Sequence, residues 1–432
     1  MTRLTFRAPS TARRRTTRTG LLLGLATAML AVCAANAAAV VVHLPGGRTI
    51  SVLPLRGAAK PALGTAPGPL TYHGGPIMPS NTNYTIYWKP SGAPAYPAEY
   101  QSGINKYLED LAHDSGGSQN VDSVATQYKD AAGEFASYNS HFGGALIDTD
   151  PYPASGCSAA TICFTDEQLR AEIKHYVEAH GLPRDLTHEY FLLTPPGVED
   201  CIELTACSAG SKIPIYCAYH GNIPATAGVI IYSNDPYVTG NSGCDNGEHP
   251  NNKPSDGALQ GGLSHEHNES ITDPELNAWS DSEGNENGDK CRTGEEASEF
   301  GTPLGKAPDG SRYNQVVNSD LYWYQQEWSN EGSQCKQRRA AGAPALTVSK
   351  LEPTSGPKAG GTTVTITGTG FAPGKTAFKF GSAKATGVSC GSSTSCTAIS
   401  PKRTKAGKVD VVATVAGKSS PKNPPADQFT YA

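Results

Sequence analysis

The stretch T-T-V-T-I-T-G-T-G-F at residues 362–371 alternates apolar side chains with threonine and then reaches two closely spaced glycines. Alternation with a period of two is typical of a strand that buries one face in a core. Shorter runs of the same kind follow at 377–381, 409–417 and 427–431, with Gly- and Pro-containing segments between them. This succession of short strands and turns predicts an all-β sandwich over residues 345–432.

Specific motifs in this region add a resemblance to a known family. The segments EPTSGPKAGGTTVTITGTGF (352–371), FGSAKA (380–385), VDVVATVAGK (409–418) and FTY (429–431) resemble the IPT/TIG family of immunoglobulin-like domains. The resemblance extends over about residues 347–431. It implies an immunoglobulin-like module that acts as a spacer or a binding domain and carries no chemistry of its own.

The N-terminal segment has the composition of an export signal. Residues 1–37 contain six arginines and no acidic residue, an apolar run from Leu21 to Val32, and the small-residue triplet Ala35, Asn36, Ala37. These features predict a secretory signal peptide over residues 1–37, and no other stretch is long and apolar enough to cross a bilayer. A lipoprotein signal would use Cys33, but Val32 stands where lipid attachment requires a small residue. We expect a protein that is secreted and extracellular or associated with the cell wall.

Cysteine usage agrees with export. Ten cysteines remain after residue 37, an even number that predicts up to five disulfides in an oxidising compartment. Three pairs have five residues between them, and we expect these to close small loops: Cys157–Cys163, Cys201–Cys207 and Cys390–Cys396. Zinc binding by the thiols is the alternative, and the absence of a C-x-x-C pair weakens it. The other four candidates are Cys217, Cys244, Cys291 and Cys335.

Charge is divided unevenly along the chain. Residues 345–432 carry eleven basic and three acidic side chains, whereas residues 38–344 carry 18 basic and 37 acidic ones. Such asymmetry bears on solubility and on partners, and not on the fold. One hypothesis is that the basic module docks on an anionic cell-wall polymer or on another extracellular protein. An exported chain with an acidic main domain is not expected to bind nucleic acid.

The region between these ends predicts a short N-terminal segment and one large domain. Residues 38–68 contain a β-rich piece with a Gly46-Gly47 turn and then an Ala/Pro/Gly-rich stretch, which predicts a hairpin and a linker. Residues 69–340 mix both element types, so we expect an α+β domain of mixed α/β, zincin-like character. The expected strands are 82–88, 189–194 and 227–233, and the expected helices are 98–114, 165–181, 256–274 and the aromatic run 321–328.

The helix expected at 256–274 contains the sequence H-E-H-N-E at 265–269. His265 and Glu269 are four residues apart and therefore lie on one helical face, where both can bind one metal ion. A glutamate directly after the first ligand is the pattern of zinc peptidases, in which it accepts a proton from metal-activated water. The pattern predicts zinc ligands at His265 and Glu269 and a catalytic base at Glu266. A carboxylate replaces the usual second histidine.

A third ligand is expected from the acidic loop that follows the helix, at Glu286 or Asp289. The same loop supports a second interpretation, a structural calcium site, because Glu283, Asn285, Asn287 and Gly288 partly imitate an EF-hand. Gly294 stands at the twelfth position of that motif, where a glutamate is required. His267 is expected to point away from the 265/269 face. Two further residues each have more than one interpretation. Asp273 is a reserve ligand or a helix terminus, and His220 is a ligand, a substrate contact or a packed histidine.

The large domain also resembles the Exordium, or phosphate-induced, family and its bacterial secreted relatives. The similar segments are YHGGPIMPSNTNYTIYW (72–88), SHEHNESITDPELNAW (264–279), NENGDKC (285–291) and YNQVVNSDLYWYQQEWSN (313–330). The resemblance implies an extracellular protein linked with cell walls and growth. It implies no particular reaction, because none is settled for that family. Its recurring motifs correspond to His265, Glu266, Glu269, Asn277, Ala278, Trp279, Glu286, Asp289 and Cys291.

Two functions remain open from the sequence. The first is a metal-dependent hydrolase, a zincin-like peptidase with a C-terminal accessory module and zinc as its cofactor. The second is a non-catalytic protein of the wall or cell surface that binds calcium structurally and adheres through its terminal domain. No Ser/His/Asp or cysteine nucleophile motif and no phosphate-binding glycine loop offers a further alternative.

Overall fold

The computed structural model describes residues 41–44, 47–56, 68–203, 206–339, 346–371, 374–390, 394–415 and 418–432. The expected signal peptide and most of the expected linker lie outside these residues. Within the described part of the chain, no helix is long and apolar enough to cross a membrane. Strands predominate over helices, and the terminal module is an immunoglobulin-like sandwich.

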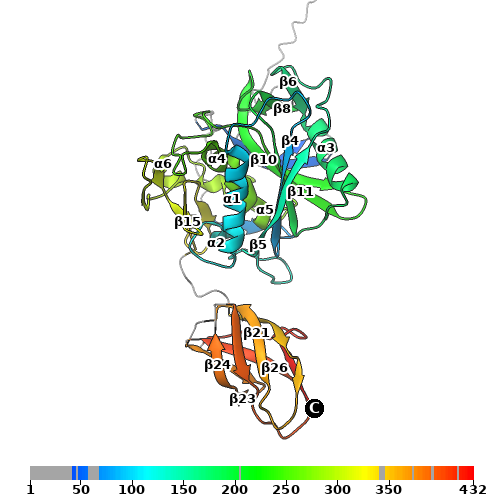
Figure 1. Cartoon of the computed structure of the whole chain (residues 1–432), viewed down its shortest axis with the longest axis vertical. Helices are drawn as coiled ribbons and strands as arrows, with labels where there is room; N and C mark the ends of the chain where they lie inside the picture. Colours follow the sequence, from blue (N-terminus) through cyan, green and yellow to red (C-terminus); the bar gives the residue numbers. More distant parts are fainter. Residues whose placement is uncertain are drawn as a thin grey trace, which may run out of the picture. The chain divides into compact units, whose positions relative to one another are not determined.

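A mixed sheet of ten strands organises the large domain (Figure 1). Its main path runs β5-β4-β7-β11-β10-β9-β8-β6, and β2, which pairs with β1, is also hydrogen bonded to β10. The strands β5, β4, β7 and β11 are parallel neighbours, whereas β10 is antiparallel to β11. The bounds are β1 Val41–Leu44, β2 Arg48–Pro54, β4 Asn81–Trp88, β5 Ser140–Asp148, β6 Ile162–Thr165, β7 His188–Leu193, β8 Val198–Glu203, β9 Ala206–Ser208, β10 Pro214–Pro224 and β11 Val229–Asp235.

Helices cover both faces of this sheet because its central strands are apolar on both faces. On β7, Tyr190 and Leu192 join the core beneath α3, whereas Phe191 and Leu193 join the core beneath α1. The helix α3 begins with the expected capping box, in which the Thr165 side chain accepts from the Gln168 amide. The helices are α1 Tyr100–His113, α2 Asp122–Ala125, α3 Asp166–Ala179, α4 Pro254–Ala258, α5 Ser264–Thr272 and α6 Glu296–Glu299.

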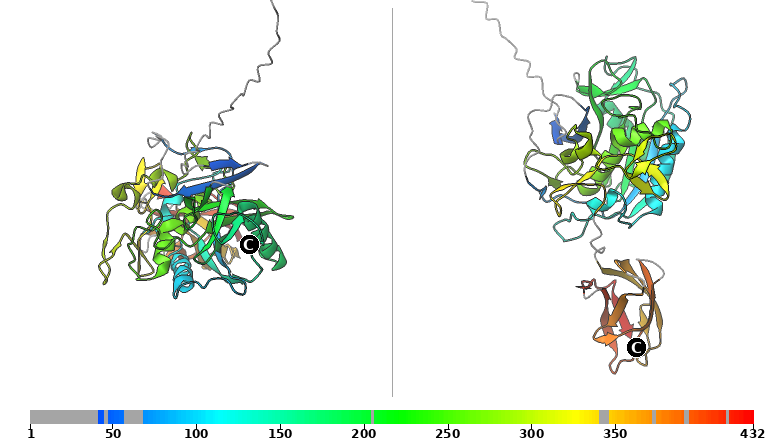
Figure 2. Two further views of the ribbon diagram at one scale, coloured as in Figure 1. Left: turned by 90° about the horizontal axis from the view of Figure 1, so that it is seen from above. Right: turned by 90° about the vertical axis from the view of Figure 1, so that its left-hand side faces the viewer.

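The N-terminal hairpin is built into the sheet. Its strand β2 runs antiparallel to β10, with Ser51 opposite His220 and Ile50 opposite Gly221 (Figure 2, dark blue). Ile50 is fully buried in the core beneath α3. The expected hairpin is therefore present, but it belongs to the large domain and does not stand apart from it.

The aromatic run at 321–328 was expected to be a helix, and that prediction is wrong. It forms the end of one short strand and the start of another, β16 Asp320–Tyr322 and β17 Glu327–Ser329. Tyrosine and tryptophan are enriched in strands, so the helix prediction went against their intrinsic preference. Other short strands in the large domain are β3 Thr71–Tyr72, β12 Trp279–Ser280, β13 Gly305–Lys306, β14 Arg312–Tyr313, β15 Gln315–Val317 and β18 Gln334–Lys336.

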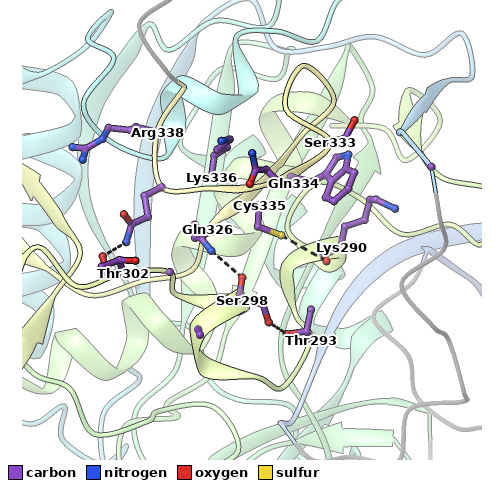
Figure 3. Close-up of a pocket in the computed structure, with 15 residues that line it drawn as sticks. Lys290, Thr293, Ser298, Thr302, Gln326, Ser333, Gln334, Cys335, Lys336 and Arg338 are labelled. Atoms are coloured by element: carbon purple, nitrogen blue, oxygen red, sulfur yellow. Dashed lines mark hydrogen bonds between the residues drawn. The ribbon is translucent and has the colours of Figure 1, made fainter.

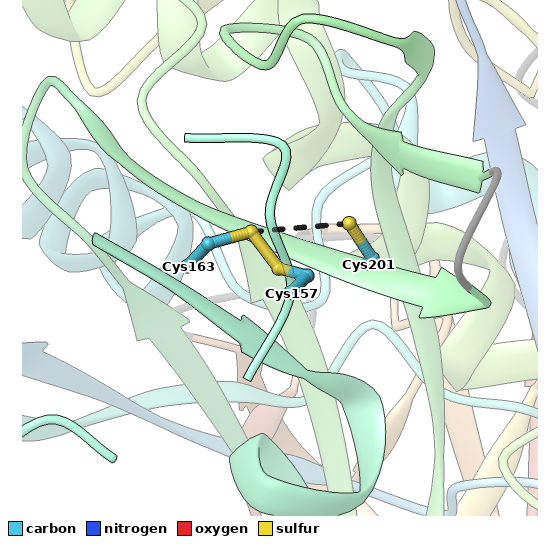
Figure 4. A group of neighbouring side chains, drawn as sticks. All are labelled: Cys157, Cys163 and Cys201. Atoms are coloured by element: carbon cyan, nitrogen blue, oxygen red, sulfur yellow. Dashed lines mark hydrogen bonds between the residues drawn. A yellow bond between two sulfur atoms is a disulfide. The ribbon is translucent and has the colours of Figure 1, made fainter. Parts of the chain in front are cut away.

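Five disulfides connect the ten cysteines, and the three short pairs expected from the sequence are among them. The remaining two are Cys217–Cys244 and Cys291–Cys335. Figure 4 shows Cys157 and Cys163 beside Cys201, whose Sγ lies 3.9 Å from that of Cys163. Because all three sulfurs are in disulfides, they are not thiolate ligands, and zinc binding by these cysteines is not supported.

The terminal domain is a two-sheet sandwich with its own core. Burial alternates along β21, where Val364 and Ile366 point inward, as the sequence pattern predicts. One sheet has the order β19-β21-β25-β24, and the other contains β20-β28-β26-β22-β23, with β27 paired to β26. The bounds are β19 Thr347–Glu352, β20 Ser355–Gly356, β21 Thr363–Thr369, β22 Thr376–Phe380, β23 Ala383–Lys384, β24 Thr386–Cys390, β25 Ser395–Ile399, β26 Gly407–Val415, β27 Lys418–Ser419 and β28 Gln428–Tyr431.

The place of β2 in the core can be tested by Ile50→Ala. We expect the free energy of unfolding of the large domain to fall by about 2–5 kcal/mol, as for other buried large-to-small changes. His43→Ala, on the exposed side of β1, is the control and should change it by less than about 0.5 kcal/mol. Urea unfolding followed by tryptophan fluorescence reports on this domain alone, since it contains all four tryptophans. Equal effects of the two variants would contradict the assignment.

Candidate metal centre

The candidate ligands lie on a helical segment that packs very closely against β10. The segment consists of α4, a π-helical stretch at Leu259–Leu263, and α5, and it ends at Asp273 before Pro274 as expected. A Cβ atom on Gly262 would lie 2.4 Å from the Ala218 Cβ, so only glycine allows this approach. The glycines that weaken the helix therefore bring α5 against the strand that carries His220.

Three predicted ligands converge at the start of α5. The His265 Nε2 atom lies 3.1 Å from Glu269 Oε1 and 3.5 Å from Asp289 Oδ1. All three side chains are buried, with 2% or less of each side chain exposed. Neither ring nitrogen of His265 makes a hydrogen bond. One imidazole and two carboxylates that meet in this way form a ligand set suited to a divalent transition metal.

The predicted base Glu266 lies beside this group and contacts a residue that the sequence analysis left undecided. His220 Nδ1 lies 3.0 Å from Glu266 Oε2 and 3.6 Å from Glu269 Oε2. The other ring nitrogen, Nε2, lies 3.7 Å from Glu286 Oε2. The structure therefore places Asp289 with His265 and Glu269, and it places Glu286 with His220.

Small residues and a backbone amide fix the position of Glu269. The Asp289 amide donates to Glu269 Oε1 at 2.9 Å, and the Ser51 hydroxyl donates to Oε2 at 3.5 Å. The backbone of Gly288 lies close to both ligands, since a Cβ atom there would lie 2.6 Å from His265 Nδ1 and 2.8 Å from Glu269 Oε1. The loop residue must therefore be glycine for the histidine and the carboxylate to keep their positions.

Burial controls the electrostatics of the centre. Desolvation, followed by repulsion from Asp289, raises the pKa of Glu269 to about 7, and desolvation raises the pKa values of Glu266 and Glu286 well above the usual range. Burial opposes a charge on His265, yet the carboxylates of Glu269 and Asp289 hold its pKa well above the ordinary value. Burial and the neighbouring His265 lower the pKa of His220 to about 3. A bound cation would relieve the repulsion that these shifts report.

The loop that partly resembles an EF-hand uses its polar groups internally. The Asp281 carboxylate accepts from the Glu283 and Asn285 amides and from Lys290 Nζ at 3.0 Å. The Asn287 side chain accepts from the Thr272 hydroxyl. These bonds shape the loop, in which the Asp281 carboxylate holds the backbone while the carboxylates of Glu286 and Asp289 face the centre.

Two neighbouring residues have structural partners. His267 points away from the centre, as expected, and its Nδ1 lies 2.7 Å from Glu189 Oε2 on β7. Asp273 is the helix terminus and not a reserve ligand, because its carboxylate accepts from the Asn277 and Ala278 amides.

Glu327 was missed by the sequence analysis. Its side chain is 1% exposed, neither carboxylate oxygen makes a hydrogen bond, and His265 and Glu269 are among the charged groups that influence its pKa. It was hidden within an aromatic run that was interpreted as a helix. Ser51 was also missed, because no local motif connects β2 with a helix more than two hundred residues later.

A pocket of about 840 Å³ in the large domain is lined by none of the predicted ligands (Figure 3). Its walls include Lys290 and Gln326, which directly follow Asp289 and directly precede Glu327 in the chain. The Lys290 ammonium lies 4.7 Å from the centre of the Trp328 ring, on the same wall. Chain neighbours of Asp289 and Glu327 therefore line this pocket, whereas the centre itself is buried.

Comparisons with known proteins identify the terminal module. Residues 346–431 match the IPT/TIG domain family. Two solved structures of the Plexin A4 full extracellular region, one of domains 1 to 10 and one of domains 1 to 8, are 24% identical over 27% of this chain, each with a TM-score of 0.19. The aligned region covers only 9% and 10% of those chains. No curated protein matches the chain.

The fit of Gly288 against the ligands can be tested by Gly288→Ala. The added methyl group would displace His265 or Glu269, so we expect zinc affinity to fall by about 10-fold or more. The exposed neighbour Ser282 gives a matched control, Ser282→Ala, which should bind zinc as the wild type does. Competition with a chromophoric chelator measures both affinities, and near-ultraviolet circular dichroism checks the fold. Equal affinities would show that this loop does not support the ligands.

Proposed function

We propose that this chain is a secreted, metal-dependent hydrolase with the ligand pattern of a zincin-like peptidase. The convergence of His265 Nε2, Glu269 Oε1 and Asp289 Oδ1 carries the proposal. Between Glu286 and Asp289, the two candidates for the third ligand, the geometry favours Asp289. A zinc ion held there would lower the pKa of bound water toward ~7 and act as a Lewis acid.

Glu266 is suited to accept the proton of the attacking water. Its Oε1 atom makes no hydrogen bond, and its Oε2 atom lies 3.0 Å from His220 Nδ1. The contact holds one oxygen and leaves the other available.

Substrate must reach a centre whose ligands are covered. We expect the approach to begin at the pocket bounded by Lys290 and Gln326, since both adjoin residues of the centre. Movement of the β17 strand, which follows Gln326, would open a path past Glu327. The terminal IPT/TIG domain would then anchor or space the hydrolase domain outside the cell.

The role of Glu266 can be tested by Glu266→Gln, which removes the base and keeps the shape of the side chain. Hydrolysis of a casein or peptide-library substrate should fall at least about 100-fold, a typical contribution of general-base catalysis. Zinc held by His265, Glu269 and Asp289 should remain, as measured by elemental analysis. The control is Glu283→Gln, an exposed carboxylate in the neighbouring loop, which should keep full activity. Unchanged turnover in Glu266→Gln would reject this mechanism.

A second function is favoured by two observations, namely the complete burial of the centre and the basic surface of the terminal domain. In this case the chain is a non-catalytic protein of the wall or cell surface, and its metal ion stabilises the fold. Calcium is a poorer candidate for this ion than zinc, because each candidate ligand group of the centre contains an imidazole and calcium prefers oxygen. The basic residues Lys402, Lys405 and Lys408 are exposed in and beside one loop before β26.

Adhesion through this loop can be tested in the full chain by the triple variant Lys402→Glu/Lys405→Glu/Lys408→Glu. We expect the wild type to be retained on isolated anionic cell-wall material and released by salt, because exposed charges are screened. The triple variant should elute at lower salt. Lys212→Glu, a charge change at an exposed position of the large domain, is the control and should leave retention unchanged. Salt-independent retention, or equal elution of all three proteins, would exclude electrostatic docking by this loop.

A further inference from the structure

The two carboxylate oxygens of Glu269 face different groups of ligands. Its Oε1 atom lies 3.1 Å from His265 Nε2, in the group completed by Asp289. Its Oε2 atom lies 3.6 Å from His220 Nδ1, in a second group completed by Glu266. In each group the ligand atoms all lie within 4.8 Å of one another, and Glu269 belongs to both. This is the arrangement of a carboxylate that bridges two metal ions.

The second group has the properties of a ligand set and not only of a packed cluster. His220 is fully buried, and its Nε2 atom makes no hydrogen bond although Glu286 Oε2 lies 3.7 Å away. Neither oxygen of Glu286 makes a hydrogen bond in the protein. An unsatisfied imidazole nitrogen and an unsatisfied carboxylate that face each other in a dry site normally carry a large energetic cost. A cation bound through His220 Nδ1 would leave the ring proton on Nε2, where it faces Glu286, and so would reduce that cost.

The number of carboxyl groups in the cluster also fits more than one ion. Four carboxyl side chains, those of Glu266, Glu269, Glu286 and Asp289, each lie within 3.7 Å of a ring nitrogen of His220 or His265. The nearby Lys290 and Arg292 form ion pairs with Asp281 and Glu299. With neutral imidazoles, four carboxylates are balanced by two divalent cations, whereas one cation leaves two negative charges buried.

We propose that the centre holds two divalent cations bridged by Glu269, the first bound by His265 and Asp289 and the second by His220 and Glu266, with Glu286 beside the second. The inference rests on the proposed metal centre and adds a site to it, in which Glu266 would bind through Oε2, the oxygen beside His220, and keep Oε1 as the base. Mixed nitrogen and carboxylate ligands select zinc, manganese or iron over calcium and magnesium. Bridged ions in such sites are about 3.5–4 Å apart, which suits attachment through two oxygens of one carboxylate.

Metal counting distinguishes one ion from two. The full chain, stripped with a chelator, is incubated with excess Zn²⁺, desalted and analysed for zinc per chain. We expect two ions in the wild type, one in His220→Gln and one in His265→Gln. The control His113→Gln changes an exposed histidine on α1 and should keep two.

A second measurement needs no variant, so it does not depend on whether a substituted protein folds. The wild type is loaded with Mn²⁺, and its electron paramagnetic resonance spectrum is recorded. Two ions that share a carboxylate should give an exchange-coupled spectrum, whereas isolated ions give the ordinary six-line signal.

The outcomes separate this inference from the proposed hydrolase. Two coupled ions without turnover would support the bridged centre and reject the hydrolase. One uncoupled ion that persists in His220→Gln would overturn the bridged centre, and turnover by that protein would leave the hydrolase standing. No bound ion in the wild type would overturn both.

Discussion

The interior of the large domain is constrained by one electrostatic problem, the burial of several carboxyl side chains beside two histidines. Glu266 and Glu269 come from α5, His220 comes from β10, and Glu286 and Asp289 come from the following loop. Each group alone would be cheaper to solvate than to bury. Their convergence therefore makes sense only if the groups compensate one another or share a cation. The fold around them supplies the close packing that keeps water out.

That packing depends on residues with almost no side chain. Gly262 allows α5 to approach Ala218 on β10, and Gly288 allows the acidic loop to approach His265. A helix with two adjacent glycines is intrinsically weak, by about 1 kcal/mol for each glycine relative to alanine. Tertiary contacts must offset this cost, and the glycine at position 262 allows α5 to lie close to β10. The π-helical stretch at Leu259–Leu263 contains both glycines and directly precedes α5, the helix that carries His265.

Much of this arrangement could be predicted from the sequence, and the limits are physical. Period-two and helical patterns located β4, β7, β11, α1 and α3, and the i, i+4 spacing placed His265 and Glu269 on one face. The alternation at 362–371 located β21. Local patterns could not show that His220 faces Glu266, since that contact depends on sheet register and on the approach at Gly262. They also failed for Glu327, because its segment was interpreted as a helix although its aromatic neighbours favour strands.

The N-terminal hairpin contributes side chains both to the core and to the centre. These contacts bear on whether the hairpin would be removed after the proposed secretion. Successive residues of β2 point to opposite faces of the sheet. Ile50 and Val52 belong to the core beneath α3, whereas Ser51 reaches Glu269 on the other face. Loss of this strand would expose apolar side chains on one face and uncover the edge of β10 beside His220 on the other. A segment with both roles is a structural part of the large domain, so we expect residues 41–56 to remain after the proposed secretion.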